Sequence, residues 1–448
     1  MLKPLRLLKR RLSARLVLLI VSILPFYAVA EPSNPVRLIY AGTLLAVPGQ
    51  PPESERTLVV KEGRIAAIKP GYLSAAEAGL EPGSVEIIDL KDVFVLPGLM
   101  DMHTHLTLQL GDPRFRNPIQ GHAILSDVEM ALDAAYYAER TLNAGFTTVR
   151  NMGSWGREIF ALRDAIEAGK IRGPRVLAAG AYISATSGHG DIHGMRESVL
   201  AAFQPSGVCD GAAECRKAVR LQVKRGADVI KLTATGGASE DNGYREAPPE
   251  LFDDELREIV STAHSLGRKV GAHAHGTAGI NAALRAGVDS VEHGTFLDKE
   301  SVRLFKKTGA YLVPTLMLQD YFERGLNAMK TDLELQRRKA FLEQPDNVAM
   351  AYRAGVNIAL GTDAGFFPHG ENARELVWYV KIGMTEMEAI KTATVNAAAL
   401  IGRSADLGTL EPGKLADLIA VPNNPLEDIS ALSHIAFVMK EGRVYRQR

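Results

Sequence analysis

The chain has little cysteine, little tryptophan and no surplus charge of either sign. Cys and Trp occur twice each, and 52 Lys and Arg residues balance 52 Asp and Glu residues. Because no basic tract occurs after residue 15, the sequence lacks the electrostatic footprint of a nucleic-acid-binding protein. We therefore expect a small-molecule substrate. The 448 residues accommodate one α/β barrel, which needs roughly 250 residues, and one smaller domain.

The two cysteines, Cys209 and Cys215, are too few for a four-thiolate metal site. A disulfide between them would close a short loop, which limits its entropic stabilisation, and it requires a suitable Cα separation. The sequence leaves open whether the two thiols are bonded.

Long apolar runs are absent after residue 30, so no later segment is suited to cross a bilayer. Before that point, basic residues between Lys3 and Arg15 precede the apolar run Leu16–Ile23 and the small-residue site Ala28–Ala30. This order predicts a signal peptide over residues 1–30, cleaved after Ala30. An uncleaved anchor is the alternative, but the apolar run is too short to span a membrane. We expect a periplasmic or secreted protein without a stable membrane anchor.

Short strands and turns fill both ends of the chain. The turn Lys61–Arg64 and the turn Lys440–Arg443 share the sequence Lys-Glu-Gly-Arg, each followed by an apolar strand. We predict one small β-sandwich built from residues 31–92 and 404–448. Its expected strands are Arg37–Tyr40, Thr57–Val60, Ile65–Ile68, Val85–Leu90, Leu415–Val421 and Ile435–Lys440.

Between these ends, apolar β-branched runs alternate with amphipathic stretches, which is typical of parallel βα units. We predict an α/β fold, a distorted (β/α)₈ TIM barrel over residues 93–403. The expected strands are Val93–Leu96, Thr147–Met152, Arg175–Ile183, Asp228–Ala234, Lys269–His275, Ser290–His293, Tyr311–Leu316 and Asn357–Gly361. The expected helices include Asp127–Asn143, Asp253–Leu266, Thr277–Ala286 and Thr385–Leu400, three of them ended by Gly145, Gly267 and Gly287.

Candidate metal ligands follow several of these strands, at the end where barrel enzymes build their sites. His103 and His105 are two residues apart, so an extended chain points both imidazoles the same way. Alone, this pair is weak evidence for a metal site, since two histidines near a strand end are more often hydrogen-bonded loop residues. Lys231 interrupts an apolar strand, where a lone buried amine is costly. It is either paired with an acid or, beside divalent cations, carbamylated by CO₂ into an anionic bridging ligand.

Three further strands add the motifs Ala272–His275, Val291–Gly294 and Gly361–Ala364, which contribute imidazole and carboxylate donors. Together these donors suit Zn²⁺ or a similar first-row metal. Glu292 precedes His293 on its strand, so we expect it on the opposite face in a structural role. His122, His264, His369 and His434 lack partner spacing and are expected to be structural.

The order His-x-His, Lys, His, His, Asp resembles the amidohydrolase superfamily, over nearly the whole chain after residue 30. The phrases VLPGLMDMHTHL, TSGHGD, GADVIKLTATGG, GAHAHG, AGVDSVEHGT and GTDAG look like the branch of imidazolonepropionase-related prolidases, other Xaa-amino-acid dipeptidases and ochratoxinase-like carboxypeptidases. The resemblance implies a binuclear metal centre with two divalent ions, Zn²⁺ above all. It implies that His103 and His105 hold the buried ion, His273 and His293 hold the exposed one, carbamylated Lys231 bridges them, and Asp363 binds metal and acts as base.

Other site residues are expected around this centre. His275 should face inward beside His273, as a ligand or, as we favour, a donor to the substrate carbonyl. His189 lies in a Gly-rich loop that would let it approach the substrate, with Asp191 and His193 as weaker candidates. Tyr244 and Arg245 could bind a substrate carboxylate or simply be solvated. Many relatives have a small hydroxyl residue in place of Leu108, and some have Tyr in place of His275, so the substrate contacts differ from the family pattern.

The sequence predicts a metal-dependent amide hydrolase. We expect a dipeptidase or carboxypeptidase that releases a C-terminal amino acid from dipeptides or N-acyl amino acids. Ochratoxin A is an N-acyl amino acid of this kind. A homo-oligomer is expected. The alternatives are a cyclic-amide or lactone hydrolase and a noncatalytic periplasmic binding protein that retains the barrel.

Overall fold

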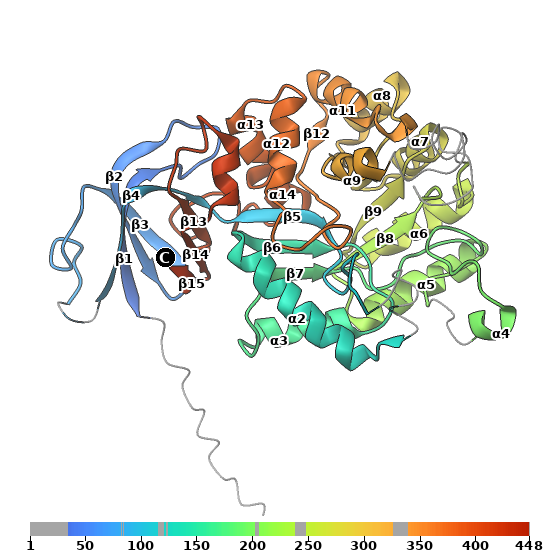
Figure 1. Cartoon of the computed structure of the whole chain (residues 1–448), viewed down its shortest axis with the longest axis horizontal. Coiled ribbons are helices and arrows are strands. Elements are labelled where there is room, and N and C mark those ends of the chain that lie inside the picture. Colours follow the sequence, from blue (N-terminus) through green and yellow to red (C-terminus); the bar gives the residue numbers. More distant parts are fainter. Residues whose placement is uncertain are drawn as a thin grey trace, which may run out of the picture. The chain divides into compact units, whose positions relative to one another are not determined.

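The computed structural model describes residues 35–81, 83, 85–114, 121, 124–201, 206–237, 248–325 and 339–447. The predicted signal peptide, residues 1–30, lies outside these ranges. Within them, no helix is both long enough and apolar enough to cross a membrane. Two sets of strands organise the described chain: a terminal sheet and a ring of parallel strands (Figure 1).

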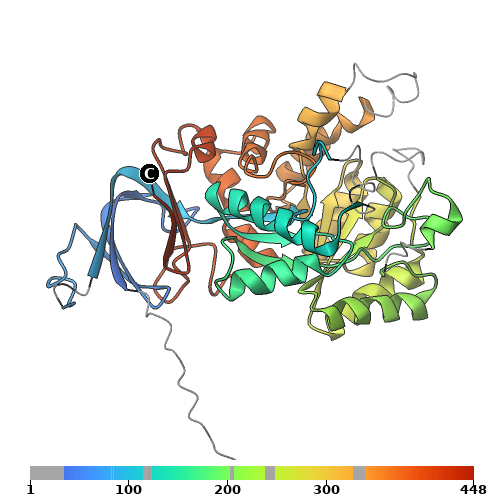
Figure 2. The same ribbon diagram turned by 60° about the horizontal axis from the view of Figure 1, so that its bottom comes forward.

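The terminal sheet has seven strands in the order β15-β14-β13-β4-β1-β2-β3, so the two ends of the chain meet in it. Figure 2 shows the N-terminal strands and the C-terminal strands curving around one interior. That interior contains Ile39, Leu58, Leu418 and Phe437, which are inaccessible or nearly so. The predicted terminal β domain, built from both segments, is confirmed. Its strands are β1 (Val36–Leu44), β2 (Glu53–Lys61), β3 (Arg64–Pro70), β4 (Val85–Pro97), β13 (Leu418–Val421), β14 (Phe437–Lys440) and β15 (Arg443–Gln447).

The predicted α/β barrel is confirmed as well. Its parallel strands form two ladders, β5-β6-β7 and β8-β9-β10-β11-β12. Parallel bridges join the ladders where regular strand has ended: Ile183 pairs with Leu232, and Thr104 pairs with Ala364. The strands are β5 (Leu99–Thr104), β6 (Phe146–Asn151), β7 (Arg175–Ala178), β8 (Val229–Thr233), β9 (Lys269–Ala274), β10 (Ser290–His293), β11 (Tyr311–Val313) and β12 (Asn357–Ile358).

The first barrel strand was predicted in the wrong place. Residues 93–96 belong to β4, where Val95 pairs with Ala420 of the terminal sheet, and the barrel begins after Gly98 with β5. The apolar run continues from one sheet into the next, so its pattern does not mark the boundary. Gly98 marks it, because a Cβ there would lie 2.3 Å from Oγ1 of Thr147 on β6.

Helices cover the outside of the ring; α2 and α3 flank β6 and β7, and α14 contacts β5 (Figure 1). The predicted helix Asp127–Asn143 is α2, which begins with a capping box between Ser126 and Glu129. The predicted helix Thr385–Leu400 is instead two helices, α13 and α14, interrupted at Ala393 and Thr394. The helices are α2 (Asp127–Asn143), α3 (Glu158–Glu167), α4 (Glu197–Leu200), α5 (Ala212–Arg225), α6 (Asp253–Ser265), α7 (Thr277–Ala286), α8 (Lys299–Thr308), α9 (Leu318–Gly325), α11 (Gln344–Arg353), α12 (Arg374–Lys381), α13 (Glu386–Thr392) and α14 (Val395–Leu400).

One ion pair and one disulfide cross-link segments of this fold. Arg175, at the start of β7, donates from Nη1 to Asp417 Oδ2 at 2.8 Å and also pairs with Glu441, so a buried ion pair joins the barrel to the terminal sheet. Cys209 and Cys215, left undecided by the sequence, form a disulfide with Cα atoms 5.0 Å apart. It ties the segment after β7 to the first turn of α5.

Candidate metal centre

The predicted ligands come together at the C-terminal ends of the barrel strands. His103 is on β5 and His105 directly follows it; Lys231 is on β8, and His273 is on β9. Each residue of the set is at most 5% exposed. The other members of the set are His275, His293 and Asp363. The barrel therefore brings residues from distant parts of the sequence into one buried site.

One cluster consists of His103, His105 and Asp363. Oδ1 of Asp363 lies 3.1 Å from Nε2 of His105 and 3.4 Å from Nε2 of His103. Their potential ligand atoms all lie within 4.8 Å of one another, close enough to hold one metal ion. Strand β5 provides both imidazoles, and the segment after β12, bridged to it at Ala364, provides the carboxylate.

The hydrogen bonds on the far sides of these rings make the cluster suited to a cation. Nδ1 of His105 donates to the carbonyl oxygen of Gly153 at 3.2 Å, and Nδ1 of His103 donates to the Glu292 carboxylate at 2.9 Å. Each neutral ring then carries a lone pair on Nε2. Both lone pairs point toward Oδ1 of Asp363, which has no hydrogen-bond partner among the described residues. Acceptors that converge in this way repel one another unless a cation lies between them.

The second cluster consists of His273, His275 and His293, whose potential ligand atoms also lie within 4.8 Å of one another. Nδ1 of His293 donates to Oγ1 of Thr315 at 2.7 Å, because that hydroxyl donates its own proton to the carbonyl of Pro314. This contact with Thr315 leaves the Nε2 lone pair of His293 directed inward. Nε2 of His273 is buried without a hydrogen-bond partner in the part of the chain that the structure describes. These imidazoles fit a second cation.

Lys231 links the two clusters. Its Nζ lies 3.4 Å from Nε2 of His103, and its charge also lowers the pKa values of His273 and His293. Burial lowers the pKa of Lys231 itself to about 8, against the opposing influence of Glu292 and Asp363. The amine thus lies beside the first cluster, and its charge reaches the imidazoles of the second.

The electrostatics favour neutral rings for three of the histidines and an ionised Asp363. Burial, assisted by the charge of Lys231, lowers the pKa of His103 to about 4, and burial likewise lowers those of His273 and His293 well below the usual range. Burial raises the pKa of Asp363, but the neighbouring His103 and His105 outweigh it and hold the value at about 2. Neutral imidazole and ionised carboxylate are the forms that bind metals.

Backbone strain marks the same place. His293, Thr315 and Asp363 have φ values of 69°, 55° and 63°, in the left-handed region that residues with a Cβ rarely adopt. His293 ends β10, and Thr315 and Asp363 lie in the segments after the neighbouring strands β11 and β12. Conformations of this kind cost about 1–3 kcal/mol each and cluster at functional sites.

The same strain corrects the prediction for Glu292. An extended chain would place it opposite His293, but the left-handed turn at His293 lets both side chains reach the barrel interior. Oε2 of Glu292 lies 2.9 Å from Nδ1 of His103, and Oε1 accepts from Nη2 of Arg150 at 2.8 Å. Burial opposes ionisation of Glu292, but Arg150 and His103 lower its pKa to about 2.

Asp101 is a buried carboxylate that holds residues around the candidate ligands, and the sequence pattern did not identify it. Its carboxylate accepts from the backbone N–H of His103 at 3.0 Å, from Oγ1 of Thr362 at 2.5 Å and from Nδ2 of Asn372 at 2.7 Å. It therefore joins β5 to the residue before Asp363. The spacing of two between Asp101 and His103 already placed both on one face, and this signal could have identified it.

The loop after β7 covers the second cluster. The ring of His189 stacks on that of His273, and it remains partly exposed, so a substrate can reach it. Asp191 and His193 hold the loop instead: Oδ2 of Asp191 accepts from the N–H of Ser187 at 2.8 Å, and Nε2 of His193 donates to the carbonyl of Gly188 at 2.9 Å.

The remaining sequence candidates lie elsewhere. Tyr244, Arg245 and His122 fall outside the described residues. His264 pairs with Asp289 at 2.8 Å on the surface. His369 is buried and donates from Nε2 to the carbonyl of Leu108 at 2.9 Å.

Comparison with known proteins agrees with this geometry. The family model described as "Amidohydrolase family" matches residues 94–445. The ochratoxinase of Aspergillus niger is 34% identical over 443 residues, which cover 92% of this chain and 87% of that protein. The imidazolonepropionase of Symbiobacterium thermophilum is 25% identical, with 91% and 96% covered.

Solved structures give the same result. A Xaa-Pro dipeptidase with bound methionine in the active site superposes with a TM-score of 0.82 at 38% identity, covering 92% of this chain and 100% of that one. The A. niger ochratoxinase superposes with a TM-score of 0.81 at 32% identity, covering 93% and 96%. With a barrel, two adjoining ligand clusters and a family match over most of its length, the chain belongs to the amidohydrolase family.

Proposed function

We propose that the chain is a binuclear metal-dependent hydrolase that releases a C-terminal amino acid from dipeptides or N-acyl amino acids, ochratoxin A among them. The observation that carries the proposal is the pair of buried ligand clusters, with Lys231 against the first of them. The substrate class follows from the relatives, since one is an ochratoxinase and another is a Xaa-Pro dipeptidase with methionine bound in its active site.

In this proposal His103, His105 and Asp363 hold the first divalent ion, and His273 and His293 hold the second. Lys231, as its carbamate, would be the anionic ligand that the two ions share. The all-nitrogen-and-oxygen donor set suits Zn²⁺. When bound, the metal pair supplies a water acidic enough to attack near neutrality and a positive charge that polarises the scissile carbonyl.

The protein residues then position the substrate and move the proton. Asp363, ionised and without a hydrogen-bond donor at Oδ1 among the described residues, accepts the proton of the attacking water and passes it to the leaving amine nitrogen. His275, whose Nδ1 is 2.7 Å from Oγ1 of Thr295, is held rigidly beside His273 to donate toward the substrate carbonyl oxygen. His189 contributes a contact from the partly exposed loop.

The test is a release assay. Metal-loaded enzyme is incubated with dipeptides, N-acyl amino acids, and cyclic amides or lactones, and free amino acid and ring opening are quantified separately. We expect free amino acid from the open-chain amides, and loss of turnover after chelation. Ring opening alone would favour the imidazolonepropionase-like alternative, and no turnover of any class would favour a binding protein.

We further propose that the chain is exported and cleaved after Ala30. The basic, apolar and Ala-x-Ala order of residues 1–30 supports this. N-terminal sequencing of the protein from the envelope or medium tests it, and a mature chain that still begins before Leu16 would refute it.

A homo-oligomer is the remaining proposal. Val128, Leu132 and Tyr136 lie four residues apart on one face of α2 and are 58–69% exposed, in line with Ile124 just before the helix. Acidic residues begin α2 and Arg140 lies in its last turn, so antiparallel pairing with a second copy would bring opposite charges together. Light scattering of the wild type should give a particle mass that is a multiple of the chain mass, and Leu132→Glu should lower that particle mass. A monomeric wild type would refute the proposal.

A further inference from the structure

A buried chain of hydrogen bonds reaches the candidate metal centre from the floor of the barrel. It runs from Arg150 on β6 through Glu292 on β10 to His103 on β5, and each of the three side chains is at most 2% exposed. Nη2 of Arg150 donates to Oε1 of Glu292 at 2.8 Å, and Oε2 of Glu292 lies 2.9 Å from Nδ1 of His103. The chemistry proposed above does not use Arg150 or Glu292.

Arg150 has two further contacts that make this chain rigid. Its Nε donates to the carbonyl oxygen of Met102 at 2.6 Å, and Nη1 donates to Oγ of Ser290 at 3.0 Å. Met102 precedes His103, and Ser290 is on the same strand as Glu292. One guanidinium therefore holds both the backbone beside the imidazole and the carboxylate that contacts the imidazole.

The charges in this chain fix which ring nitrogen of His103 carries the hydrogen. Guanidinium is always protonated and only donates, so the Glu292 oxygen beside it accepts. An ionised carboxylate has only acceptors, so its other oxygen requires a hydrogen on Nδ1 of His103. Nε2 of His103 is then left with its lone pair, 3.4 Å from both Asp363 Oδ1 and Lys231 Nζ.

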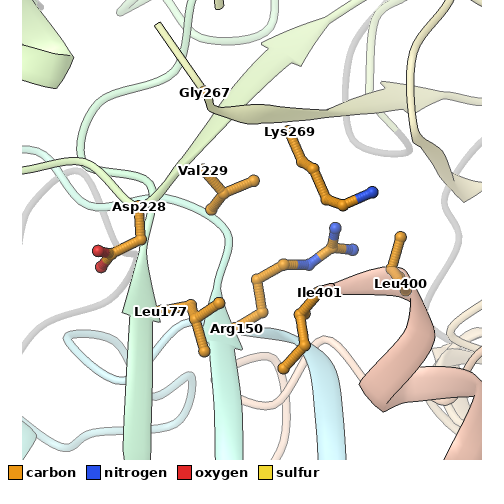
Figure 3. Close-up of a pocket in the computed structure, with 8 residues that line it drawn as sticks. All are labelled: Arg150, Leu177, Asp228, Val229, Gly267, Lys269, Leu400 and Ile401. Atoms are coloured by element: carbon orange, nitrogen blue, oxygen red, sulfur yellow. The ribbon is translucent and has the colours of Figure 1, made fainter. Parts of the chain in front are cut away.

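Arg150 reaches the end of the barrel opposite the candidate ligands. Arg150 lines a cavity of about 140 Å³ together with Val229 and Lys269, the first residues of β8 and β9 (Figure 3). The ligands, by contrast, lie at the C-terminal strand ends. A change in Arg150 or Glu292 can therefore alter the ligand His103 without touching the face from which the substrate enters.

We propose that Arg150 and Glu292 are a positioning pair that holds His103 in the tautomer and orientation of a metal ligand. The inference rests on the proposed binuclear centre. Outer carboxylate partners of metal-bound histidines typically change metal affinity by about 10–100-fold when removed. The carboxylate here needs Arg150 because its charge would otherwise be buried without a permanent cation.

Glu292→Gln is the informative variant, because an amide cannot accept on both sides. If its NH₂ faces His103, Nδ1 must accept and the hydrogen moves to the ligand atom Nε2; if its NH₂ faces Arg150, two donors oppose each other. Glu292→Asp keeps both acceptors on a shorter side chain, and Arg150→Lys keeps the charge with fewer donors. The matched control is Glu255→Gln, a buried carboxylate that accepts from the N–H groups of Gly211 and Phe252.

The experiment measures metal affinity by chelator competition, the visible spectrum of the Co²⁺-loaded protein, and the melting temperature of the metal-free protein. We expect Glu292→Gln to bind the ion of the His103 cluster about 10–100-fold less tightly and to change the Co²⁺ spectrum. Glu292→Asp and Arg150→Lys should each show a smaller loss, and Glu255→Gln none. If Glu292→Gln keeps the wild-type metal affinity and spectrum, the positioning role is overturned and the proposed function is left intact. If Glu292→Gln does not fold, the same result in both Glu292→Asp and Arg150→Lys overturns it. A wild-type protein that binds no metal would refute the proposed function and this inference with it.

Discussion

The imidazole rings of His189 and His273 lie face to face, with centroids 4.1 Å apart and planes inclined by 17°. One ring comes from the loop after β7 and the other from β9, so the stack positions the loop over the second cluster. Gly237 makes room for it, since a Cβ at that position would lie 2.3–2.5 Å from Cε1 and Nδ1 of His189.

Gly237→Ala should therefore displace His189 without changing the metal ligands. We expect the catalytic efficiency kcat/KM to fall by about tenfold or more, as a misplaced substrate contact near the reacting atoms does, while the metal content stays that of the wild type. Steady-state kinetics and elemental analysis check this together. The control is Gly309→Ala, where no atom lies within 4 Å of the added Cβ; its φ of 76° makes Ala strain the backbone there, so it tests strain away from the site, which should leave kcat/KM unchanged. Unchanged kinetics in Gly237→Ala would show that the position of His189 does not matter.

Lys231→Ala should lose both metal and activity. The wild type should retain close to two metal equivalents after mild purification, and the variant fewer than one, because the ligand shared by the clusters is gone. A short carboxylic acid such as acetate or propionate should restore part of the activity by replacing the carbamate. Lys269→Ala, at the start of the neighbouring strand, is the control. Full metal content in Lys231→Ala argues against a bridging lysine.

Asp363→Asn should preserve the shape of the site and remove its proton acceptor. We expect kcat to fall by about 10² or more, the scale of general acid–base catalysis, with little change in melting temperature. Asp254→Asn, exposed in the first turn of α6, serves as the comparison. Turnover at the wild-type rate by a metal-loaded Asp363→Asn would move the role of base to His275 or His189.

Arg175→Leu should loosen the packing of the terminal sheet against the barrel. The substitution leaves Asp417 buried without its cation, and breaking a buried pair in this way costs about 3–5 kcal/mol in the free energy of unfolding. The exposed pair Arg56–Glu53 offers the contrast, because Arg56→Leu should cost less than about 1 kcal/mol. Urea unfolding compares the two variants. Equal losses would mean that the Arg175 pair contributes no more than a surface contact.

Sequence pattern predicted the barrel because buried parallel strands are apolar throughout and helices such as α2 carry local start signals, here the capping box of Ser126 and Glu129. It predicted the candidate ligands because a His, Lys or Asp at a strand end is conspicuous. It did not predict that Glu292 turns inward, which depends on the left-handed backbone at His293. Arg150 was equally invisible, since an arginine in a strand gives no sign that its partner lies on a distant strand.

The pairing of Val95 in β4 with Ala420 in β13 constrains the order in which the molecule can be completed. A growing chain makes β4 and the whole barrel before it makes the strand that covers β4, so this edge stays open throughout synthesis. Open edges invite pairing with other chains. A protein truncated before Leu418 would contain every candidate metal ligand and yet should aggregate. The last strands therefore protect the newly synthesised chain from aggregation and contribute no ligand to the site.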